Sequence, residues 1–328
     1  MLKRTAIVDW AKLVYAFVIV LVHANYLMPG TYNWQLVECF GGGYVAVEFF
    51  FIVSGFLMAA SGNKVKEPVE SLGIETIRFV WRKIKVLLPF YLVAYLFTFI
   101  LNQALNNVSF HDAIKNLVYS IPYLFRYNMA GFKATSDPIG SAWYISSMLL
   151  AMLGLYPMLR KYKDTFTCVI APLLTLFLYG YISQTRSNIS AASIWIGWVY
   201  VGNLRAVAGI SLGCTCWKIS QQVKRVEFTK IGVLALTSLE MICYIFPVIS
   251  MQLWAHTYLD FILIFMFAIA ITISFSERSY SAKIVHAPAW VANLSLTLYF
   301  VHQQMIGVVK KFFAGGGYMG QASISADF

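Results

Sequence analysis

The stretch that decides the fold runs over residues 41–57 and reads GGGYVAVEFFFIVSGFL. It is apolar apart from Glu48, and a helix that crosses a bilayer needs about 17–25 mostly apolar residues. A second, mostly apolar run extends from Ala6 to Val22 and ends at His23. An ionisable side chain at membrane depth is costly, so Glu48 and His23 are candidates for a functional site.

The composition agrees with a membrane protein. Hydrophobic residues make up 59% of the 328 residues, charged residues make up 12%, and the mean hydropathy is +0.68. A soluble domain carries about 25% charged residues. The sequence therefore predicts an all-α, polytopic transmembrane helical bundle and excludes an ordinary soluble domain.

Nine stretches meet the length and hydropathy of a membrane span. They cover about residues 5–28, 43–61, 86–104, 141–159, 165–182, 194–217, 229–249, 254–275 and 289–309. We expect these spans to form one domain over residues 1–313, followed by a polar C-terminal tail, 314–328. The stretch from about 105 to 140 is expected to be an external loop with an interfacial helix.

The loop charges predict the orientation, because Lys and Arg are enriched in cytoplasmic loops. With a cytoplasmic N-terminus, 17 of the 25 Lys and Arg residues lie inside, six lie outside and two fall within spans. The net charge of +11 is then mostly a topology signal, and it requires no nucleic-acid partner.

The cysteines do not predict a metal site. Cys214 and Cys216 are separated by one residue, but the chain has five cysteines and offers no matching second pair. We therefore expect no metal.

His23 and Glu48 are predicted neighbours. Each lies about five residues from the outer end of its span, which places both about 7 Å deep at 1.5 Å per residue. A short connection makes the two helices antiparallel neighbours. A carboxylate beside an imidazole fixes its tautomer and favours its charged form, as a general base requires. The alternative is a structural buried hydrogen bond.

Basic residues gather toward the cytoplasmic side. Asp9 and Lys12 are spaced to pair on one helical face. Arg78, Arg82 and Lys85 form one helical stripe that is able to hold phosphates by charge-assisted hydrogen bonds. The alternative for this stripe is a cytoplasmic flank that reaches lipid headgroups.

Arg205 lies near the middle of the sixth predicted span, and Glu240 near the middle of the seventh. An arginine at this depth faces the bundle interior and is paired, and Glu240 is the expected partner. A structural ion pair and a contact with substrate or cofactor both remain open.

Three further pairs are candidates: Trp143 with Tyr144, Tyr299 with His302, and His256 with Asp260. The first is either an interfacial aromatic belt or a stacking platform for a sugar. The second is a candidate lining of a substrate path through the ninth span. The third, at the outer start of the eighth span, is expected to be an exposed surface pair.

These residues form a pattern that resembles the acyltransferase type 3 family of bacterial integral-membrane O-acyltransferases. The resemblance rests on the following positions: Asp9, Lys12 and His23 in one helix; Glu48 before Phe50-Phe51 and Ser54-Gly55-Phe56; Arg82 and Lys85 before Pro89 and Tyr91; Trp143-Tyr144; Arg205 before Leu212-Gly213; and Ser295, Tyr299 and His302. It covers residues 7 to about 305, although the family has Arg more often than Lys at position 12 and typically ten spans.

The resemblance implies transfer of an acyl group, usually acetyl, from cytoplasmic acyl-CoA to a hydroxyl of an extracytoplasmic or lipid-linked glycan at the bacterial cytoplasmic membrane. We expect His23 and Glu48 to be catalytic, with His23 as general base or, in a second route, as acyl carrier. Asp9, Lys12, Arg78, Arg82, Lys85 and Arg205 are the predicted cofactor-binding residues. Trp143, Tyr144, Tyr299 and His302 are the predicted substrate-binding residues. We expect one of three residues, Lys12, Arg205 or Tyr299, to stabilise the negative charge of the cofactor or the oxyanion that develops during the transfer.

Two other classes of function compete with this prediction. The first is a proton-coupled transporter or flippase that uses His23, Glu48 and Arg205 as a path, although no inverted repeat supports it. The second is a sensory or scaffold membrane module without catalysis. Consumption of a thioester separates the enzyme from both, and the sequence names neither the acceptor nor the oligomeric state.

Overall fold

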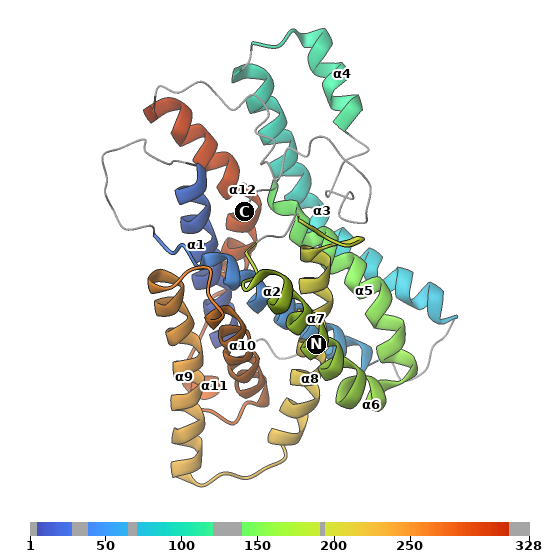
Figure 1. The fold of residues 1–328 in the computed structure, drawn as a ribbon, viewed down its shortest axis with the longest axis vertical. Coiled ribbons are helices and arrows are strands. Elements are labelled where there is room, and N and C mark those ends of the chain that lie inside the picture. The colour runs from blue at the N-terminus through green and yellow to red at the C-terminus, as the bar shows by residue number, and fades with distance from the viewer. Residues whose placement is uncertain are drawn as a thin grey trace.

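The computed structural model describes residues 5–27, 39–64, 71–105, 107–120, 140–190 and 194–314. The described chain is almost entirely helical (Figure 1). The principal helices are α1 (Ala6–Leu27), α2 (Ala46–Gly62), α3 (Leu72–Leu105), α4 (Phe110–Ser120), α5 (Trp143–Lys161), α7 (Ala171–Arg186), α8 (Val201–Val223), α9 (Lys230–Leu253), α10 (Leu259–Ser276) and α12 (Ala289–Ala314).

Short elements join these helices. The 3₁₀ turns η1 (Gly43–Val45) and η3 (Gly140–Ala142) precede α2 and α5, and α6 (Lys163–Thr165) and the π-helical η4 (Phe166–Ile170) lead into α7. Another short helix, α11 (Ser281–Ile284), precedes α12. The strands β1 (Trp195–Ile196) and β2 (Val199–Tyr200) pair antiparallel in a small hairpin before α8.

A helix occurs at each of the nine predicted span positions, and seven segments among the described residues are long and apolar enough to cross a membrane. They are Ala6–Asn25, Gly43–Gly62, Leu72–Ala104, Gly140–Lys161, Lys163–Arg186, Lys230–Leu253 and Leu259–Ser276. Crossings by α8 and α12, and a cytoplasmic N-terminus, remain predictions.

Several predicted boundaries are wrong. The third helix starts at Leu72 rather than at 86, because the basic stretch is itself helical and the helix continues through Pro89 into the apolar stretch. The sixth predicted span loses residues 194–200 to the hairpin, and the eighth starts at Leu259. The helix expected between residues 105 and 140 is confirmed as α4, and the predicted tail from residue 315 onward lies outside the described residues.

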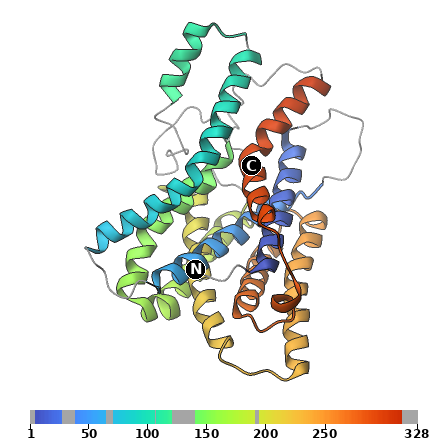
Figure 2. The ribbon, with the colours of Figure 1, turned by 180° about the vertical axis from the view of Figure 1, so that it is seen from behind.

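Helix α8 forms the centre of the bundle and contacts α2, α5, α7 and α10. Its neighbours replace lipid on most sides, which explains why it carries more polar residues than the outer helices. Helix α12 lies beside α1 and also contacts α3, and both views show α1 and α12 side by side (Figures 1 and 2).

Candidate active site

His23 lies on the last turns of α1, and its ring is oriented by its own helix. Nδ1 lies 2.8 Å from the carbonyl oxygen of Ile19. Because a carbonyl only accepts hydrogen bonds, Nδ1 carries the hydrogen, and the proton-free nitrogen of the neutral ring is Nε2. Nε2 has no hydrogen-bond partner among the described residues. This tautomer leaves Nε2 available as a base.

His302 on α12 lies against His23. The two ring centroids are 4.8 Å apart, with the rings in an edge-to-face arrangement. His302 repeats the local geometry of His23, since its Nδ1 lies 3.0 Å from the carbonyl oxygen of Leu298. The residue is 2% exposed, and its buried Nε2 has no hydrogen-bond partner among the residues that the structure describes. Two imidazoles from α1 and α12 therefore share one site.

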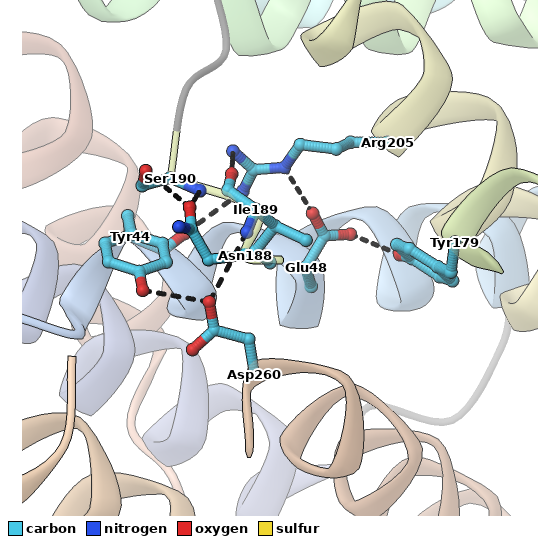
Figure 3. Close-up of polar contacts among 8 residues, drawn as sticks. All are labelled: Tyr44, Glu48, Tyr179, Asn188, Ile189, Ser190, Arg205 and Asp260. Atoms are coloured by element: carbon cyan, nitrogen blue, oxygen red, sulfur yellow. Dashed lines mark hydrogen bonds and ion pairs between the residues drawn. The ribbon is translucent and has the colours of Figure 1, made fainter. Parts of the chain in front are cut away.

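Glu48 on α2 belongs to a different cluster, shown in Figure 3. Its Oε1 accepts a hydrogen bond from Arg205 Nε at 2.5 Å, and its Oε2 accepts one from the hydroxyl of Tyr179 on α7. Arg205 and Glu48 are 1% and 0% exposed. Arg205 also donates from Nη1 to the carbonyl of Ile189 at 2.7 Å and from Nη2 to the carbonyl of Tyr44 at 3.1 Å. The guanidinium is thus surrounded by acceptors of the protein.

Two predicted pairings are therefore wrong. Glu48 does not contact His23, and Arg205 does not contact Glu240. Glu240 instead accepts hydrogen bonds from Ser274 at 2.5 Å and Ser281 at 2.6 Å. Sequence position gives the depth of a side chain in a helix, but the rotation of each helix about its axis decides which partner it faces.

Asp260 is also placed differently from its prediction. It is 1% exposed rather than on the surface. Its Oδ2 accepts a hydrogen bond from the Tyr44 hydroxyl at 2.8 Å (Figure 3). That hydroxyl accepts one from the backbone nitrogen of His256 at 2.6 Å. The exposed His256 ring stacks on Tyr44 at 5.1 Å. Asp260 and Tyr44 thus extend the cluster around Arg205.

Aromatic side chains connect the two clusters. The Trp143 ring lies 5.3 Å from the guanidinium carbon of Arg205, and Trp143 contacts Tyr144 edge-on at 6.5 Å. Tyr144 contacts Tyr299 at 5.7 Å, and Tyr299 contacts His302 at 6.4 Å. The four predicted substrate-binding residues therefore form a continuous series of ring contacts. The histidine pair lies at one end of this series, and the Glu48–Arg205 pair lies at the other.

The two tyrosine hydroxyl groups in this series form hydrogen bonds within the protein. Tyr144 shares a hydrogen bond of 3.2 Å with Ser54, and the Tyr299 hydroxyl donates to the carbonyl of Ser141.

Tyr179, the partner of Glu48, was not predicted from the sequence. Nothing distinguishes a functional tyrosine in an apolar helix from an ordinary one, so the sequence carried no signal for it.

The predicted cofactor residues fall into separate groups. Lys12 and Asp9 form the expected pair at 3.2 Å. Lys83 on α3, which was not predicted, interacts electrostatically with Lys12 and Arg82. Basic residues from α1 and α3 therefore meet about 16 Å along α1 from His23. Arg205 lies apart from them, in the Glu48 cluster.

The basic stripe lies on one helix, as predicted. Arg78, Arg82 and Lys85 are exposed on the first turns of α3. Close by, Glu75 accepts hydrogen bonds from Arg160 Nε at 2.7 Å and from Tyr156 at 2.8 Å, which ties α3 to α5. Exposure leaves the stripe open to a phosphate or to lipid headgroups. No group of three or more His, Cys, Asp or Glu residues in the described part of the chain is arranged to hold a metal ion.

Comparison with known proteins matches this chain to one family. A family model described as an acyltransferase domain (acyltransferase type 3) aligns with residues 5–324. No curated protein and no solved structure matches the chain. Since the family model covers nearly every residue and the described chain is a bundle of apolar helices, the protein is a multi-pass membrane protein that belongs to the acyltransferase type 3 family.

Proposed function

We propose that the protein transfers an acyl group, by family resemblance acetyl, from cytoplasmic acyl-CoA to a hydroxyl of an extracytoplasmic or lipid-linked glycan. The observation that carries this proposal is the geometry of His23: its Nδ1 contacts the Ile19 carbonyl, and its Nε2 has no hydrogen-bond partner in the described part of the chain. We place the protein in the bacterial cytoplasmic membrane, with the N-terminus inside.

In the proposed reaction, Nε2 of His23 takes the proton of the acceptor hydroxyl while the hydroxyl oxygen attacks the thioester carbonyl. The new carbon–oxygen bond forms, the carbon–sulfur bond breaks, and the proton passes to the departing thiolate. Among the described residues, no carboxylate forms an ion pair or hydrogen bond with His23 to stabilise the imidazolium that forms there. Its neighbour is the ring of His302, whose Nε2 has no hydrogen-bond partner within the described ranges.

The basic residues support a donor that enters from the opposite end. Lys12, Lys83 and the α3 stripe are suited to nucleotide phosphates, because ammonium and guanidinium groups bind phosphate by charge-assisted hydrogen bonds. Lys12 and His23 are eleven residues apart, so they share one face of α1 within about 20°. An extended pantetheine arm along this face would carry the thioester toward His23.

We do not assign the oxyanion role to Arg205 or Tyr299 in this scheme. Each nitrogen of the Arg205 guanidinium already donates one hydrogen bond, to Glu48, Ile189 or Tyr44, and the Tyr299 hydroxyl donates to Ser141. The same contacts weaken the transporter alternative. A proton path through His23, Glu48 and Arg205 would need these groups in sequence, and the first lies in a different cluster from the other two.

The test is consumption of radiolabelled acetyl-CoA by purified protein in liposomes that contain glycan acceptors. We expect His23→Ala to lower transfer at least about 100-fold, since general acid–base catalysis contributes roughly 10²–10⁴-fold. Its thermal unfolding should match that of the wild type. His286→Ala is the control, because His286 is exposed and its Nδ1 likewise contacts a nearby carbonyl, that of Ile284. Wild-type protein that never consumes the thioester would exclude the enzyme, and full activity in His23→Ala would exclude this base.

His302→Ala provides a finer test. We expect kcat to fall by about tenfold, the value of one lost polar interaction of about 1.4 kcal/mol, with KM for acetyl-CoA unchanged. The reason is that His302 contacts His23 and lies far from the basic residues proposed to hold the donor. An unchanged kcat, or a loss confined to KM, would remove His302 from this role.

A further inference from the structure

A polar cavity of ≈ 330 Å³ lies at the end of the bundle where α2 and α8 finish and α6 begins. Its lining includes three cations, Lys163, Lys218 and Arg225, and the side chains of Asn63, Trp217 and Gln221. None of these residues belongs to the site described above. The cavity is therefore a separate feature of the same bundle.

The charge of this cavity is unbalanced. Lys218 pairs with Asp164 at 2.5 Å, and that carboxylate is 76% exposed. Lys163 lies over the Trp217 ring, 5.7 Å from its centroid, and neither Lys163 nor Arg225 forms an ion pair among the described residues. Lys218 and Arg225 also interact electrostatically with each other, as like charges. Three positive charges thus converge with one shared, solvent-exposed carboxylate.

The remaining polar groups favour the same kind of ligand. Asn63 and Gln221 each add an amide that is able to donate hydrogen bonds next to the cations. Ammonium, guanidinium and amide donors around one cavity suit an anion with several acceptor oxygens, and a phosphate group is the common biological anion of that kind. We propose that this cavity, formed by Lys163, Lys218 and Arg225, binds a phosphate group.

The position of the cavity connects it to the α3 stripe. Arg160 donates from Nη1 to the carbonyl of Gly62, the residue before Asn63, at 2.9 Å. Through Nε it binds Glu75 at the start of α3, one helical turn before Arg78. The cavity and the basic stripe therefore share one end of the bundle, the end proposed to be cytoplasmic.

Two sources of phosphate fit this position. One is the nucleotide of the acyl-CoA donor, which carries phosphate at two separate places and would engage the stripe and the cavity together. The other is a lipid headgroup at the membrane surface. Assignment to the donor rests on the proposed function, whereas the phosphate site itself does not.

The experiment compares Lys163→Gln/Arg225→Gln with Lys161→Gln/Lys230→Gln, using the full chain. Both double variants lose two exposed positive charges, but Lys161 and Lys230 do not line the cavity. The first arm measures the Kd of adenosine 3′,5′-bisphosphate in neutral phosphatidylcholine nanodiscs. The second arm counts phosphatidylglycerol molecules retained by detergent-purified protein, using native mass spectrometry.

We expect the cavity variant to weaken binding of the bisphosphate by at least about tenfold, the effect of losing one charge-assisted contact, with the control within about twofold. A loss of retained phosphatidylglycerol without a change in nucleotide Kd would support the phosphate site and assign it to lipid. Equal effects of the two double variants, or no effect in either arm, would overturn the proposal. Absence of thioester consumption would contradict the proposed function and leave this result standing.

Discussion

At the scale of single residues, the buried ion pair of Glu48 and Arg205 joins α2 to α8. Arg205 on α8 connects two other parts of the chain: the continuous segment η1–α2, through the Tyr44 carbonyl and Glu48, and the loop after α7, through the Ile189 carbonyl. Its planar guanidinium offers five donors in a fixed geometry, which a lysine cannot imitate. We therefore infer that Glu48 and Arg205 hold the site together rather than act on the substrate.

Glu48→Gln tests this inference. The substitution keeps the shape of the side chain but leaves the buried guanidinium without its counterion, and breaking a buried pair in this way costs about 3–5 kcal/mol. We expect a clear fall in the thermal unfolding midpoint in detergent, together with lost activity. Glu227→Gln, which removes an exposed carboxylate with no ion pair among the described residues, should leave both unchanged.

The double variant Glu48→Gln/Arg205→Met sharpens this test. Because it removes the orphaned charge, it should recover part of the stability lost in Glu48→Gln alone. A Glu48→Gln protein of wild-type stability but without activity would instead return Glu48 to a catalytic role.

At the scale of elements, the crossing of α2 and α8 determines the position of the site. A Cβ at Gly55 would lie 2.0 Å from the Ile210 carbonyl oxygen, and one at Gly213 would lie 2.1 Å from that of Ile52. Gly209 and Gly213 have the spacing of a small-residue motif that lets membrane helices approach closely. Glu48 lies two turns before Gly55 and faces Gly209, so this close approach brings Glu48 and Arg205 into contact.

We expect Gly55→Ala and Gly213→Ala each to lower stability by about 1–3 kcal/mol or more, because the added methyl group forces two backbones apart. Gly154→Ala and Gly180→Ala are matched controls, since nothing lies within 4 Å of a Cβ at either position. Thermal unfolding of the four variants checks the prediction. Comparable midpoints for the crossing and control variants would show that the helices tolerate separation.

At this scale, the sequence predicted the existence of the helices but not all of their boundaries. The helices themselves were predictable, because an apolar run of sufficient length in a membrane has few alternatives to a helix. The boundaries of α3 and α8 were not, since hydropathy detects the membrane core and does not detect where a helix continues into a polar region. The long start of α3 and the hairpin before α8 are the resulting errors.

At the scale of the whole molecule, α8 is a central helix that does not reach the hydropathy of a membrane span, and its contacts with α2, α5, α7 and α10 are the reason that we predict a crossing. A helix surrounded by other helices has little contact with lipid, so its composition is free to include Arg205, serines and glycines. These polar and small residues lower the mean hydropathy of α8, which is not among the seven detected segments.

Labelling with a membrane-impermeant maleimide tests the crossing. In a background without the five native cysteines, Trp198→Cys lies on the hairpin before α8 and Glu227→Cys lies after its end. Trp198 is 92% exposed and Glu227 is exposed. We expect intact cells to label position 198 and only opened cells to label position 227. Labelling of both positions from the same side would show that α8 does not cross, and labelling of position 227 alone would reverse the orientation.

The sequence by itself determined the class of the protein and the approximate positions of its helices. Apolar runs of sufficient length suffice for these. The depth of each ionisable residue in the membrane stays a prediction. The sequence also identified most members of the site, including His23, Glu48, Arg205, Tyr299 and His302. Only the tertiary structure decided which of them meet. His23 contacts His302 and Glu48 contacts Arg205, because the rotation of each helix, set by packing such as the glycine contact of α2 with α8, directs a side chain to one neighbour rather than another.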